Sequence, residues 1–62
     1  MTTEEIRYLI REHIERMREI DYLLRDPNLA ENLKWRLINE REKIERRTLL
    51  LMRKLDFVRM PS

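Results

Sequence analysis

The feature that most limits how this chain can fold is Pro27, which separates two amphipathic segments in a sequence without glycine. Proline disfavours helical geometry at the residue before it, here Asp26, and fits well in the first turn of a new helix. Either Asp26 caps a helix that begins at Pro27, or Asn28 caps one with Glu31 three residues later. This segment therefore predicts a tight turn between two helices, and a single kinked helix is the alternative.

The segment before the turn has the spacing of an amphipathic helix over about residues 3–25. Thr2 and Glu5 have the spacing of a capping box, and Thr3 is a competing N-cap. Apolar residues then recur every three or four positions and predict one buried helical face, which His13 shares. The apolar residues of this face are Ile6, Leu9, Ile10, Ile14, Met17, Ile20, Leu23 and Leu24.

The segment after the turn predicts a second, longer helix over about residues 28–59. Glu40 and Arg41 interrupt its inner face, and Pro61 lies where a helix stop is expected. The inner face consists of Ala30, Leu33, Leu37, Ile44, Thr48, Leu51, Leu55 and Val58.

These segments predict an all-α fold: one helical-hairpin domain over residues 1–62, with a turn at about 26–28. Two helices bury only one side of each other, and a chain of 62 residues is near the lower limit for independent folding. Cysteine is absent and His13 is the single histidine, so neither a disulfide nor a multi-histidine metal site within one chain can stabilise the fold. We therefore expect a homodimer that forms a four-helix bundle, in which parallel and antiparallel packing of the copies both fit the pattern.

The lengths of the two helices predict an overhang. At 1.5 Å per residue they measure about 33 and 48 Å, so the first helix covers the second only to about Leu51. The apolar side chains of this overhang would be left in water, and exposed apolar groups gathered in this way mark an association surface. The predicted oligomer core is Ile6, Ile10, His13, Met17, Ile20, Leu24, Leu33, Leu37, Ile44, Leu51, Leu55 and Val58. The predicted partner surface is Leu49, Met52, Phe57 and Met60.

Charged residues form rows beside the apolar faces. One interpretation is ion pairing, in which the basic row of one helix lies beside the acidic row of the next. The other is nucleic-acid binding through the arginines of the first helix, with Tyr22 beside them. The basic rows are Arg7, Arg11, Arg18 and Arg25, then Arg36, Lys43, Arg47 and Lys54. The acidic rows are Glu5, Glu12 and Glu19, then Glu31, Glu42, Glu45 and Asp56.

Two further features have competing interpretations. His13 is either a pH-sensitive group, or half of a paired site across a two-fold axis, or a neutral core histidine bonded to a polar neighbour such as Glu40 or Thr48. An interrupted second stripe on the second helix is either a surface for another protein or incidental exposure. This stripe consists of Trp35, Ile38, Leu49, Met52 and Met60.

The sequence contains no pattern typical of an enzyme. Without glycine there is no glycine-rich phosphate loop, and no Glu-x-x-His pair is present to build a di-iron site. We expect no catalysis, no cofactor and no metal. The longest apolar run, Leu49 to Met52, is too short to span a bilayer, and the N-terminal segment lacks a signal-peptide layout. We expect a soluble cytoplasmic protein.

In size and layout the expected dimer is similar to the repressor-of-primer family of RNA-binding helical hairpins. No stretch of the sequence matches that family, so no functional residues are carried over. The aspartyl-phosphate phosphatases of sporulation are also short helical hairpins, but their Ser-Gln-Glu-Leu-Asp signature is missing.

Taken together, these features predict a non-enzymatic helical interaction module that associates with itself and docks another protein. The alternative is a small dimeric RNA- or DNA-binding regulatory protein that uses the arginines of the first helix.

Overall fold

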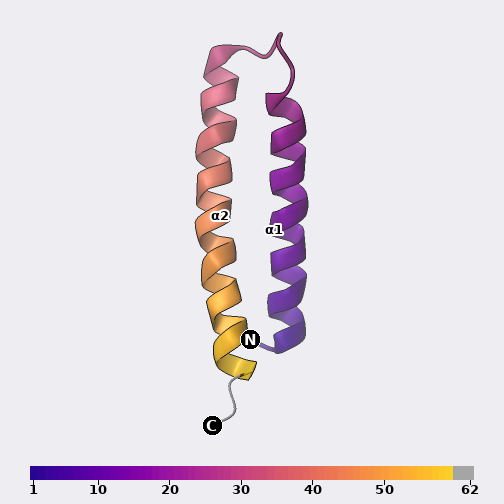
Figure 1. The fold of residues 1–62 in the computed structure, drawn as a ribbon, viewed down its shortest axis with the longest axis vertical. Coiled ribbons are helices and arrows are strands. Elements are labelled where there is room, and N and C mark those ends of the chain that lie inside the picture. The colour runs from indigo at the N-terminus through magenta and orange to yellow at the C-terminus, as the bar shows by residue number, and fades with distance from the viewer. Residues whose placement is uncertain (60–62) are drawn as a thin grey trace.

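A computed structural model describes the backbone of residues 1–59 and the side chains of residues 1–57. It contains two α-helices, α1 (Thr3–Leu24) and α2 (Glu31–Arg59), and no strand within the described residues. The helices run antiparallel, side by side (Figure 1). The predicted all-helical chain is therefore confirmed, and the alternative of one kinked helix is wrong.

The N-terminus of α1 is capped as the sequence predicts. The Thr2 hydroxyl accepts a hydrogen bond from the Glu5 amide at 3.2 Å, and the Thr2 carbonyl accepts one from the Ile6 amide at 3.1 Å. Thr3, the competing N-cap, is the first residue of the helix itself. Glu4 and Glu5 lie in the first turn, where their negative charge is favoured by the helix dipole.

The connection between the helices is longer than predicted and spans residues 25–30. The Asp26 carboxylate accepts a hydrogen bond from the Asn28 amide at 2.9 Å, and the Asp26 carbonyl accepts one from Leu29 at 3.3 Å. Both bonds hold an Asx-type turn, so Asp26 does not cap a helix at Pro27. Asn28 is not the cap either, because α2 begins at Glu31. No described residue has a positive φ, which explains how the turn forms without glycine.

The core between the helices is small. Among the described side chains, the buried hydrophobic ones are Ile6, Ile20 and Leu51. Thr48 is also buried, and its hydroxyl donates to the Ile44 carbonyl at 2.8 Å, so the polar group is satisfied. The remaining inner residues are half-buried: Ile10, His13, Met17, Leu24, Leu37, Ile44 and Leu55.

The predicted overhang of α2 beyond Leu51 is wrong. The N-terminal end of α1 lies beside the C-terminal part of α2, and the hairpin measures 51 × 15 × 15 Å (Figure 1). Leu55 is accordingly half-buried rather than exposed. The reason is the late start of α2, which shifts the extra length of the second segment toward the turn. Any association surface must therefore be sought along the sides of the hairpin.

Candidate functional site

The closest polar contact between the helices joins Arg16 of α1 to Glu40 of α2. The guanidinium Nε donates to Glu40 Oε2 at 2.6 Å and Nη2 donates to Oε1 at 3.3 Å, while Nη1 donates to Glu19 at 2.9 Å. The hydrogen bond from Arg16 lowers the pKa of Glu40 below its ordinary value, although partial burial opposes the shift. The same contact raises the pKa of Arg16, so this pair is ionised at neutral pH.

A second ion pair lies on the other side of the hairpin. Arg41 Nε donates to Asp21 Oδ1 at 2.7 Å, and a further Arg41 nitrogen lies 3.5 Å from Glu45. Arg16 and Asp21 are five residues apart, which places them about 140° apart around α1. The two pairs therefore mark opposite sides of the contact between the helices. We call these sides the Arg16 face and the Asp21 face.

These pairs differ from the ones that the charged rows predict. Neither Arg16 nor Asp21 belongs to a predicted row, and sequence reasoning missed both. A signal was present, because Glu40 and Arg41 interrupt the inner face of α2 and need partners at the same level of an antiparallel neighbour. In the described part of the chain the rows themselves contribute only Glu19 and Glu45, each bound within its own helix.

The two example partners predicted for His13 are bound elsewhere. Glu40 is bound by Arg16, and Thr48 donates to its own helix, so neither group is the expected partner. His13 is half-buried and lines a shallow hollow on the Arg16 face, beside Leu50 and Arg47.

The residues predicted for an oligomer core differ widely in exposure within the single chain. Ile6, Ile20 and Leu51 are buried, whereas Leu33 is 45% exposed. Leu33 is therefore not part of the hairpin core, because α1 ends at Leu24 and the two ion pairs place Leu33 at about the level of Asp26, beyond that end. The side chain of Val58 lies outside the described residues. Whether the exposed parts of this set are covered by a second copy stays a prediction.

The residues predicted for a partner surface are exposed but do not form one patch. The exposed fraction is 54% for Leu49, 40% for Met52 and 79% for Phe57, while Met60 lies outside the described residues. Leu49 and Met52 lie about 60° apart around α2, and Phe57 is turned about 140° from Met52. The structure therefore brings Leu49 and Met52 together and separates Phe57 from them.

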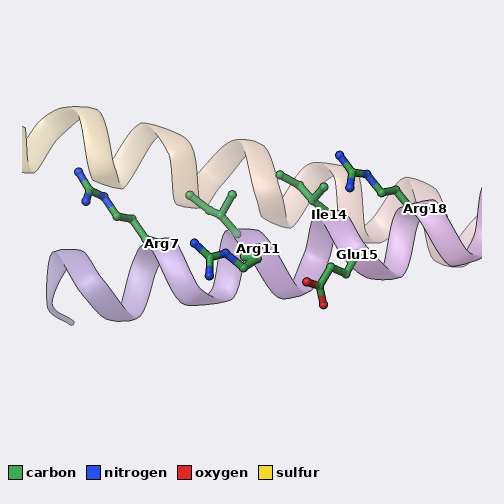
Figure 2. Close-up of a pocket in the computed structure, with 6 residues that line it drawn as sticks. Arg7, Arg11, Ile14, Glu15 and Arg18 are labelled. Atoms are coloured by element: carbon green, nitrogen blue, oxygen red, sulfur yellow. The ribbon is translucent and has the colours of Figure 1, made fainter.

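The arginines proposed to contact nucleic acid are all exposed. Three of them, Arg7, Arg11 and Arg18, line a shallow groove of about 440 Å³ on α1, and Ile14 lies between Arg11 and Arg18 (Figure 2). The groove is also lined by Ile10 and Glu15. Arg25 lies in the connection after α1 and is not part of this groove.

The described residues contain no group of three histidine, aspartate or glutamate side chains placed to hold a metal ion. No helix in this part of the chain is long and apolar enough to cross a membrane. What the surface does offer is exposed apolar side chains flanked by charge.

No protein-family model matches this chain, and no curated protein or solved structure matches it either.

Proposed function

We propose that this chain is a non-enzymatic helical interaction module that works by associating with itself. The observation that carries the proposal is the amount of surface that the hairpin leaves uncovered. The single chain exposes 5610 Å². A compact globular protein of 7.9 kDa exposes about 4,400 Å².

The difference between these areas, about 1,200 Å², exceeds the roughly 800 Å² that each partner loses in a stable protein interface. Pairing of two hairpins would therefore bring the exposed area per chain to the ordinary range. It would also give each helix two further neighbours, as in a four-helix bundle.

The chemistry of the exposed surface supports the same conclusion. Large apolar side chains remain half or more exposed along α2, among them Trp35, Leu49 and Leu50. Single exposed residues of this kind need no explanation, but several of them on one helix of a hairpin with so small a core favour an association surface.

Sedimentation equilibrium over a range of protein concentrations, at low and at high salt, tests this proposal. We expect a dimer or larger assembly that persists at high salt, because burial of apolar surface does not weaken as salt rises. A folded monomer at every concentration would overturn the proposal.

A second candidate function rests on the groove lined by Arg7, Arg11 and Arg18 (Figure 2). Arginines spaced along one helix can contact successive phosphates of RNA or DNA, although Glu15 in the same groove opposes an anion. Fluorescence anisotropy with a labelled RNA or DNA oligonucleotide would detect such binding. Affinity that falls steeply with salt and is lost in an Arg11→Gln, Arg18→Gln variant supports this function. Binding that survives the double substitution contradicts it.

A further inference from the structure

Apolar side chains from both helices lie together on the Asp21 face. On α1, Ile10 and Ile14 lie within about 20° of Asp21 around the helix, and both are half-buried. On α2, Met52 lies within about 20° of Arg41, and Leu49 follows within a quarter turn. Ile38 extends the same side of α2 toward the turn.

Charge on the Asp21 face is divided between the two helices. The outer rim of α1 is basic and contains Arg7, Arg11 and Arg18, none of which pairs with a carboxylate of the described residues. The outer rim of α2 on the same face contains the carboxylates of Glu42 and Asp56, together with Arg53, which lies within about 20° of Glu42 around the helix. A surface with arginines along one edge and carboxylates along the other offers ion pairs to a copy of itself.

We propose, as a refinement of the self-association described above, that a second copy docks on the Asp21 face about a two-fold axis parallel to the helices. This operation places α1 of each copy antiparallel to α2 of the other. The arginine rim of one chain then lies beside the Glu42 and Asp56 carboxylates of its partner, twice in the dimer.

The register of the hairpin shows which residues would meet. The Arg16–Glu40 and Asp21–Arg41 pairs set the register between the two helices, since each arginine reaches about three residues along the other helix, in opposite directions. On their mean, Arg16 lies level with about Lys43 and Asp21 with about Ile38. Counting outward at the helical rise puts Ile10 near the level of Leu49, and Arg18 near the level of Glu42. An axis parallel to the helices keeps these levels, so Ile10 packs near Leu49 of the second copy and Arg18 lies near its Glu42.

The alternative two-fold axis, perpendicular to the helices and lying within the interface, is disfavoured by charge. It would stack α1 on α1 and bring the two arginine rims together. Like charges side by side oppose docking, and the carboxylates of α2 would face each other in the same way.

The Arg16 face is a poorer docking surface although its rims also differ in charge. Its exposed leucines, Leu23 and Leu33 near the turn and Leu50 near the other end, are separated by the Arg16–Glu40 pair. Arg47 lines the hollow beside Leu50. Both faces contain an interhelical ion pair, so the difference lies in the apolar groups. On the Asp21 face Ile10, Ile14, Leu49 and Met52 lie together on one side of the pair, whereas on the Arg16 face the exposed leucines are divided between its two ends.

Adjacent leucines on α2 provide a matched test of the face. Leu49 and Leu50 are 54% and 57% exposed, so a glutamate at either position leaves the fold of the single hairpin unchanged, which circular dichroism checks. In sedimentation equilibrium we expect Leu49→Glu to raise the dimer dissociation constant at least tenfold, a change of about 1.4 kcal/mol or more. Leu50→Glu is expected to change it less than about twofold, within 0.4 kcal/mol.

The symmetry is tested by the distance between the two turns. The chain has no cysteine, so a spin label on an Asn28→Cys variant reports on the exposed turn alone. The proposed axis places both turns at one end of the bundle, and pulsed electron resonance would then give a distance of about 20–30 Å, roughly two helix diameters. A distance near the 51 Å length of the hairpin would overturn the proposed axis.

The outcomes separate this inference from the function on which it rests. A monomeric wild-type chain overturns both. A dimer that is broken by Leu50→Glu and not by Leu49→Glu leaves self-association standing and overturns the choice of face.

Discussion

Ile20 has no exposed surface in a hairpin that buries few other apolar side chains. We expect Ile20→Ala to lower the free energy of unfolding by about 2–5 kcal/mol, because it removes buried contacts and leaves a cavity. Urea unfolding followed by circular dichroism at a fixed protein concentration measures the change. Tyr22→Ala, at a side chain that is 75% exposed, is the control and is expected to have little effect. A loss below about 1 kcal/mol for Ile20→Ala would mean that the site collapses around the smaller residue.

Glu40 gives the stability of the hairpin a dependence on pH. Its pKa is lower in the folded chain than its ordinary value of 4.5, because Arg16 donates hydrogen bonds to the carboxylate. The folded state therefore binds fewer protons than the unfolded state in acid, and the stabilisation present above about pH 4.5 is lost as the pH falls through the lowered pKa.

We expect a Glu40→Gln variant to be less stable than the wild type at pH 7 and to lose less stability between pH 5 and pH 3. Urea midpoints across this range provide the measurement. Glu12→Gln, which changes an exposed carboxylate without a partner on α2 among the described residues, is the control. Equal acid sensitivity of the Glu40→Gln variant and the wild type would contradict this assignment.

At this scale the sequence predicts the apolar residues better than the polar ones. The three-and-four spacing identifies Ile6, Ile20 and Leu51 as inner residues, because spacing alone decides which side chains share a face. It does not identify Arg16 and Asp21, since their role depends on which residues of the second helix lie at the same level. That level is set by the turn, and the turn is where the sequence prediction fails.

The start of α1 can be tested as an element. Thr2→Ala removes the hydroxyl that binds the Glu5 amide and is expected to destabilise the hairpin by about 0.5–2 kcal/mol. Thr3→Ala is the matched control, because Thr3 is already within the helix and is expected to have a smaller effect. Thermal unfolding followed at a helical wavelength compares the two variants. A larger loss of stability for Thr3→Ala than for Thr2→Ala would show that Thr3, and not Thr2, is the N-cap.

The two helices differ in how well the sequence locates them. The first is predicted to within a residue at both ends, since capping and apolar spacing agree there. The second begins three residues later than predicted. Both capping interpretations assume that the side chains of Asp26 and Asn28 serve a helix, whereas the Asp26 carboxylate is used by the turn itself.

The whole molecule is a rod, and the proposed dimer makes a prediction about its dimensions. Side-by-side docking adds thickness to a particle of 51 × 15 × 15 Å but leaves its length nearly unchanged. Small-angle X-ray scattering of the associated protein is therefore expected to show a maximum dimension close to that of one hairpin. A maximum dimension about twice as large would indicate end-to-end association and contradict docking along the Asp21 face.

The overhang of α2 that the helix lengths predict is a property of the whole molecule, and this prediction is wrong. The predicted length of each helix is nearly right. The offset between the helices, however, depends on how many residues the connection uses and on whether the extra length of α2 lies near the turn or at the opposite end. The consequence is that exposed leucines near the end of α2 belong to the long sides of the rod, where Leu49 and Leu50 lie on different faces.

The connection over residues 25–30 turns the chain back fully, so the start of α1 and the end of α2 lie at one pole (Figure 1). A segment whose two ends lie at the same end of the fold can be inserted into a surface loop of an unrelated host protein without moving the two sides of that loop apart. The turn would then stand about 51 Å from the host as a rigid lever. A reporter group placed at Asn28 would be held at that height, so the hairpin would act as a molecular spacer of fixed length.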